Sequence, residues 1–147
     1  MGRQEDKAEI EQLLYRYAWM VDERRWELID EVFTPDATID YVSTGGKAGP
    51  VRETLAWLDR ALAPWPINMH VITNIAPEIA GERAACRSCF MAPMGRPRDD
   101  GGQETITNAG YYFDKLLKTK RGWRIQERIC KQIIMIGALP AGYQIPD

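Results

Sequence analysis

The second half of the chain is dominated by long segments with the composition of β-strands. They are rich in β-branched and aromatic residues and are predicted at 68–80, 83–94, 104–118 and 123–136. Tight turns at 80–83 and 120–123 join two pairs of these strands as hairpins, and 95–102 is predicted to be a mobile loop. Consecutive long strands of this kind form an antiparallel meander, so one large sheet must organise the fold.

Helices are predicted only in the first half. Over residues 6–21 the apolar positions recur every three or four residues, which is typical of an amphipathic helix. A short helix is expected at 26–33, ended by 34–36, and a third is expected from Pro50 to about Ala63. Between the last two, the alternating segment 37–42 predicts a strand and 43–49 predicts a loop.

Helices that precede a meander indicate an α+β fold. We expect a single domain, residues 1–147, in which a strongly curved, mostly antiparallel sheet wraps around the N-terminal helices. Such a cone leaves a cavity that is open at one end and suits a small ligand.

Composition excludes several classes of partner. The net charge is −2 with no block of basic residues, which argues against nucleic acid and anionic membranes. No apolar segment is long enough to span a bilayer, and the charged N-terminus lacks the apolar core of a signal peptide. A cytoplasmic location is therefore expected, with the three cysteines as reduced thiols.

His70 is the only histidine of the chain and lies in a predicted strand. It is either a core residue or the base of a site, because histidine exchanges protons near neutral pH. Asp22, at the end of the first helix and next to Trp19, could accept one ring N–H and so fix the tautomer. Strand alternation puts Ile72 on the same face as His70.

Other polar residues are candidates for the same pocket. The phenols of Tyr17 and Tyr41 could polarise a carbonyl or a leaving hydroxyl, although both also fit ordinary packing positions. Asn108 is a possible neutral donor, and Arg128 is either a solvated charge or a contact for a substrate oxygen. No metal site is expected, because cysteines 86 and 89 would face opposite sides of a strand.

Several segments resemble a known family. YAWMVD at 17–22, WELIDEVFTPDA at 26–37 and IDY at 39–41 resemble the opening of SnoaL-like proteins of the nuclear transport factor 2 superfamily. HVITN at 70–74 and GWRI at 122–125 resemble two later blocks of the same family. The resemblance covers nearly the whole chain and implies the cone-shaped fold. The nearest subgroup contains scytalone dehydratase, bile-acid dehydratases and hexachlorocyclohexane dehydrochlorinase.

The resemblance also implies roles for individual residues. Asp22 and His70, 48 residues apart, match an acid–histidine pair that acts without a cofactor. Tyr17 matches a tyrosine of the bile-acid dehydratases. Tyr41 lies near the position of a tyrosine that scytalone dehydratase uses to activate its substrate through water. Arg128 matches an arginine of the dehydrochlorinase. The chain departs from scytalone dehydratase in lacking a second histidine, and from the dehydrochlorinase in having Tyr17 in place of a lysine.

These observations predict a cofactor-independent carbon–oxygen lyase that resembles a dehydratase. Its expected catalytic residues are His70, Asp22, Tyr17 and Tyr41, and its expected substrate contacts are Arg128, Asn108, Trp19 and Ile72. A small hydrophobic substrate, aromatic or polycyclic, fits the aromatic content. The alternatives are an isomerase or cyclase, an aldehyde-releasing retro-aldol lyase, and a non-catalytic module like a ring-hydroxylating dioxygenase small subunit.

A homo-oligomer is expected because segments 104–118 and 123–136 carry apolar residues on both faces. The dehydratase resemblance favours a trimer over a dimer. The tail, 137–147, is expected either to close the mouth of the cavity or to pack on a neighbouring subunit.

Overall fold

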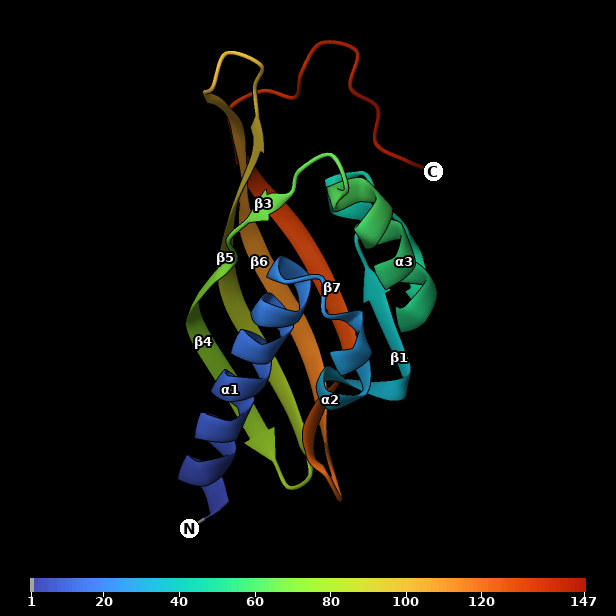
Figure 1. The fold of residues 1–147 in the computed structure, drawn as a ribbon. Coiled ribbons are helices and arrows are strands. Elements are labelled where there is room, and N and C mark those ends of the chain that lie inside the picture. Colours follow the sequence, from blue (N-terminus) through green and yellow to red (C-terminus); the bar gives the residue numbers. More distant parts are fainter. Residues whose placement is uncertain (1) are drawn as a thin grey trace.

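A computed structural model describes residues 2–147 and has the predicted α+β architecture (Figure 1). The helices are α1 (Gly2–Asp22), α2 (Ile29–Val32) and α3 (Val51–Leu62), with 3-10 turns η1 (Trp26–Leu28) and η2 (Val42–Thr44). The strands are β1 (Phe33–Asp40), β2 (Ala48–Pro50), β3 (Ile67–Asn68), β4 (Val71–Ala80), β5 (Arg83–Pro97), β6 (Gln103–Thr119) and β7 (Gly122–Ile136).

All strands belong to one curved sheet. Its order is β2-β1-β7-β6-β5-β3, and β4 also pairs with β5. The β1–β7 pair is parallel and the remaining pairs are antiparallel. In Figure 1, α1 lies across the sheet in front of β4 to β6, while α3 lies beside β1. The predicted α+β cone is confirmed.

Helix α1 fills the concave side of the sheet. Its stripe is at most 1% exposed and consists of Ile10, Leu13, Leu14, Tyr17 and Val21. Burial of each large side chain stabilises the fold by about 1.5–3 kcal/mol. The helix begins earlier than the apolar pattern alone predicts. Asp6 anchors its first turns by accepting hydrogen bonds from Lys118 Nζ at 2.7 Å and from Trp123 Nε1 at 2.8 Å.

Several predicted boundaries were wrong, because strand pairing extends further or breaks earlier than composition indicates. The strand predicted at 37–42 ends at Asp40, and the loop predicted at 43–49 contains most of η2 and of β2, which pairs with β1. Strand β1 already begins at Phe33, which pairs with Ile125 of β7, so 34–36 continue the strand rather than ending a helix. The β5–β6 ladder runs on to the Pro97–Gln103 pair, which shortens the predicted loop. The strand predicted over 68–80 is interrupted before Val71, and a bulge follows at Asn74, whose φ is +53°.

The C-terminal tail, 137–147, packs on α3 of its own chain (Figure 1). Trp57 Nε1 donates to the Pro146 carbonyl at 2.8 Å, and the Tyr143 hydroxyl donates to the Ala61 carbonyl at 3.3 Å. The Tyr143 ring also lies 6.1 Å from that of Trp65. The tail therefore covers the α3 side of the cone. Among the described residues, no helix is long and apolar enough to cross a membrane.

Candidate active site

Asp22 and His70 form a hydrogen-bonded pair at the end of α1. One carboxylate oxygen, Oδ1, lies 2.5 Å from the His70 ring nitrogen Nδ1, and the other, Oδ2, accepts the His70 backbone N–H at 2.8 Å. Their side chains are only 12% and 10% exposed, respectively. Because a carboxylate can only accept, Nδ1 carries the proton in this contact, which leaves Nε2 of the neutral ring as the basic nitrogen.

Local backbone geometry brings the pair together. His70 lies in the gap between β3 and β4, so its N–H is not used in the strand ladder and can donate to Asp22. On the other side, the chain turns sharply after α1 at Arg24, whose φ is +56°. The Arg24 guanidinium donates to the carbonyls of Val21 at 2.8 Å and Trp65 at 3.0 Å. This arginine ties the end of α1 to the segment that leads to His70, a role that the sequence analysis missed.

Two cavities meet at His70. An outer groove of about 470 Å³ is lined by Tyr15, Ala18, Trp19, Asp22, Glu23, Asn68, Met69, His70 and Ile72. An inner chamber of about 60 Å³ lies inside the cone and is lined by Tyr17, Tyr41, Thr44, Leu58, Leu62, His70, Phe90, Ala92, Met94, Asn108, Tyr112 and Cys130. His70 is the residue common to both, so its imidazole lies at the boundary between them.

The predicted site residues divide between these cavities. Trp19, which is 64% exposed, and Ile72 line the outer groove with Asp22. Tyr17, Tyr41 and Asn108 line the inner chamber.

The two candidate phenols are in direct contact. The hydroxyls of Tyr17 and Tyr41 form a hydrogen bond, and the Tyr17 ring lies edge-on to the His70 ring at 6.4 Å. Burial raises the pKa of Tyr17 and holds that of Tyr41 well above its usual value. Both phenols therefore keep their protons near neutral pH. One of the two protons makes the hydrogen bond within the pair, and the other remains on the second hydroxyl.

Arg128, a predicted substrate contact, lies outside both cavities. Its side chain is fully buried, and its Nε and Nη2 donate to the two Asp114 oxygens at 2.7 and 2.8 Å. The guanidinium also lies over the rings of Tyr17 at 4.2 Å and Tyr112 at 3.9 Å. Burial alone would lower the pKa of Arg128, but the adjacent Asp114 charge holds it well above its usual value. In this arrangement the Arg128 guanidinium packs against one face of the Tyr17 ring and holds the ring in place.

Asn108 provides an unused acceptor in the chamber. Its Oδ1 is buried and has no hydrogen-bond partner among the described residues. A buried carbonyl oxygen without a partner costs about 1–3 kcal/mol, so a donor group on a bound molecule would be stabilised there. The sequence analysis did not identify Tyr112, which stacks on Phe90 at 4.5 Å and completes this wall.

Comparison with known proteins identifies the family. The model of the SnoaL-like domain matches residues 2–129. The chain belongs to the SnoaL-like family. An uncharacterized relative of this SnoaL-like protein, from Mycobacterium tuberculosis strain H37Rv, is 36% identical over 124 residues, covering 84% of this chain and 83% of its own length.

Solved structures place this SnoaL-like chain in the nuclear transport factor 2-like fold. The Kfla4162 protein of Kribbella flavida has a TM-score of 0.80 at 26% identity, over 90% of this chain and 94% of that one. A scytalone dehydratase-like protein of Novosphingobium aromaticivorans has a TM-score of 0.71 at 19% identity, over 92% of both chains. A hexachlorocyclohexane dehydrochlorinase, LinA type 2, has a TM-score of 0.76 at 17% identity, over 96% and 97%. The fold is thus shared with enzymes that process small molecules.

Proposed function

We propose that this SnoaL-like protein catalyses a cofactor-independent β-elimination on a small hydrophobic substrate. Nε2 of His70 removes a proton from a substrate carbon, and the electron pair of the broken C–H bond forms a C=C bond. The bond from the neighbouring carbon to its leaving group then breaks. For a hydroxyl leaving group, a phenol proton from the Tyr17–Tyr41 pair completes the departing water.

The observation that carries this proposal is the double contact between Asp22 and His70. Contacts to both the ring and the backbone of His70 fix the tautomer and the direction of the imidazole. The carboxylate also stabilises the imidazolium that forms when Nε2 takes the proton. A base positioned in this way contributes on the order of 10²–10⁴-fold to the rate.

The inner chamber supports the choice of substrate class. Its walls are mostly apolar or aromatic, and its few polar groups are His70, the phenols, Thr44 and Asn108. Its volume of about 60 Å³ is well below the roughly 300–1,000 Å³ of sites that enclose a whole small molecule. A larger substrate therefore has to extend into the outer groove or displace side chains that line the chamber, such as Leu58 and Leu62 of α3. A chamber that reaches His70 favours an enzyme over the non-catalytic subunit alternative.

Mass spectrometry of products tests the reaction type. We would incubate the protein with a panel of β-hydroxy ketones, aromatic and polycyclic alcohols and halogenated cyclohexanes. Loss of water or hydrogen halide by the wild type, and not by His70→Gln, is the expected result. A product of unchanged mass would indicate an isomerase or cyclase, and a released aldehyde a retro-aldol lyase. Equal turnover by His70→Gln would overturn the proposal.

Exposed apolar side chains support the expected homo-oligomer. Near the end of β7, Ile133, Ile134 and Ile136 are 52–54% exposed, and Ile129 is 39% exposed. Residues of this kind on an open sheet favour burial against another subunit. We propose a homo-oligomer, a trimer rather than a dimer. Light scattering coupled to gel filtration measures the mass of the particle in solution directly. The mass of a single chain would contradict the proposed oligomer.

A further inference from the structure

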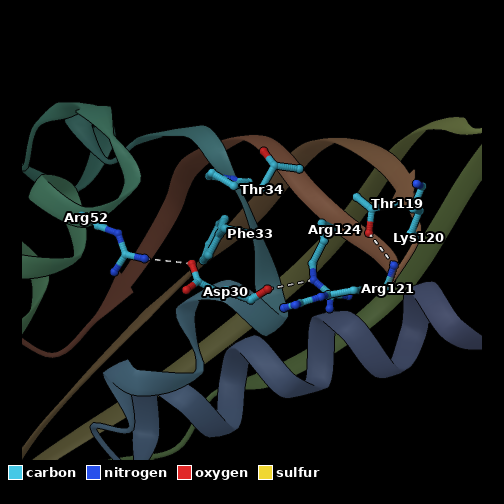
Figure 2. Close-up of a pocket in the computed structure, with 9 residues that line it drawn as sticks. Asp30, Phe33, Thr34, Arg52, Thr119, Lys120, Arg121 and Arg124 are labelled. Atoms are coloured by element: carbon cyan, nitrogen blue, oxygen red, sulfur yellow. Dashed lines mark hydrogen bonds and ion pairs between the residues drawn. The ribbon is translucent and has the colours of Figure 1, made fainter.

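A second pocket lies at the edge of the cone, away from His70. It has a volume of about 590 Å³ and is lined by Asp30, Phe33, Thr34, Pro35, Arg52, Thr119, Lys120, Arg121 and Arg124. Figure 2 shows that these residues come from α2, the start of β1, α3, the end of β6, the β6–β7 turn and the start of β7. None of them lines the groove or the chamber at His70. The pocket is therefore a separate site.

The pocket carries an excess of positive charge. Four of its lining residues are cationic, and its single carboxylate, that of Asp30, is already paired with Arg52 at 2.8 Å (Figure 2). Within residues 2–147, the side chains of Lys120 and Arg121 make no hydrogen bond or ion pair. Both residues are exposed at the turn.

Arg124 is a largely buried cation that makes no ion pair with any residue of 2–147. The residue is only 9% exposed, and its guanidinium donates to two backbone carbonyls, those of Asp30 at 3.0 Å and Trp123 at 2.9 Å. Buried arginines are usually paired with an acid, because desolvating an uncompensated charge is costly. Burial, followed by the positive charge of Arg16, lowers the pKa of Arg124, and the charges of Glu31 and Glu9 offset only part of this effect. A bound anion would supply the missing negative charge.

We propose that this pocket binds a phosphate ester with an apolar body. Guanidinium groups match the geometry of phosphate oxygens and hydrogen-bond them in pairs, and the unpaired Lys120 ammonium adds a point charge. The exposed ring of Pro35 provides an apolar surface beside the cations for the rest of the molecule, and Phe33, which is only 1% exposed, packs in the core at the base of the pocket. The volume lies within the range of small-molecule sites.

Calorimetric titration with phenyl phosphate tests the site. The double variant Lys120→Gln/Arg121→Gln removes two cations whose side chains make no hydrogen bond or ion pair within residues 2–147, so it should remain folded. The matched control, Arg3→Gln/Lys7→Gln, removes the same charge from exposed positions on α1. We expect the pocket variant to bind at least about tenfold more weakly than the wild type, and the control to change by less than about twofold.

Two further ligands separate the contributions of charge and body. Inorganic phosphate should bind more weakly than phenyl phosphate, and benzyl alcohol, which lacks the anion, should not bind measurably. Equal weakening in both double variants would mean non-specific attraction to charge and would overturn the proposal. So would the absence of phenyl phosphate binding to the wild type at millimolar concentration, or equal affinity for phenyl and inorganic phosphate.

Discussion

Replacing Asp22 with asparagine should reverse the tautomer of His70. Asp22 offers two acceptors, one to the ring nitrogen Nδ1 and one to the backbone N–H of the same residue. Asparagine offers one acceptor and one donor group. If its oxygen keeps the backbone N–H, its amide donates to Nδ1, and the ring proton must move to Nε2. If the amide is turned round, two N–H donors face each other and one hydrogen bond is lost.

The size of the effect follows from these contacts. With the proton on Nε2, the imidazole cannot accept a proton from the substrate. The same change in a Ser-His-Asp triad lowers kcat about 10⁴-fold, so we expect a loss of about 10²–10⁴-fold here. Both contacts remain but are no longer charge-assisted, which should lower the free energy of unfolding by about 1–3 kcal/mol. The variant should therefore remain folded at room temperature.

Nitrogen-15 NMR reads this directly, because the chain contains a single histidine. The wild type should show a neutral ring protonated on Nδ1, and Asp22→Asn a ring protonated on Nε2. The control is Asp99→Asn, which makes the same chemical change at an exposed residue that lines neither cavity. It should leave both the tautomer and the turnover unchanged. An unchanged tautomer in Asp22→Asn would refute this reasoning.

Three further predictions concern stability and reactivity. Asp114→Asn leaves the buried Arg128 charge without its partner, so urea unfolding should show a loss of about 3–5 kcal/mol; a loss below about 1 kcal/mol would mean that the pair is dispensable. Burial raises the pKa of the Cys86 and Cys130 thiols to about 12, so a thiol reagent at pH 8 should label Cys89 first. Rapid labelling of all three cysteines would contradict the structure. Burial also raises the pKa of Tyr17 and Tyr41 in the folded state. As pH rises, the unfolded chain therefore loses these phenol protons before the folded protein does, at about pH 10. Their contribution to stability is full below about pH 10 and declines as pH rises, which thermal unfolding from pH 8 to 11 should show for the wild type and less for Tyr41→Phe.

Periodicity was sufficient for the fold because the large elements bury continuous apolar patterns. The stripe of α1 and the hairpins of the meander could be read directly, since each side chain's face is set by position along a helix or strand. Composition does not show where one strand begins to pair with another. For this reason β1 was expected to begin after 34–36, although Phe33 already lies opposite Ile125. The break in the strand at residues 69–70 was likewise not predicted. This break leaves the backbone N–H of His70 free to donate to Asp22.

The candidate site was predictable only in part. The family resemblance supplied Asp22 and His70, whose contact spans two elements that no local pattern links. The partner of Arg128 was missed, because Asp114 lies on the neighbouring strand and only the register reveals that the two face each other. The basic pocket was missed for a similar reason: its cations come from two segments that are far apart in the chain, Arg52 on α3 and residues 120–124 at the β6–β7 turn.

The most direct test of the account is the isotope effect on a substrate found in the product screen. With deuterium on the carbon that loses its proton, the wild type should turn over more slowly than with hydrogen. His70→Gln should lower kcat/KM by about 10²–10⁴-fold on either substrate. Wild-type turnover by His70→Gln, with the isotope effect intact, would show that another group removes the proton and would contradict the assignment of His70 as the base.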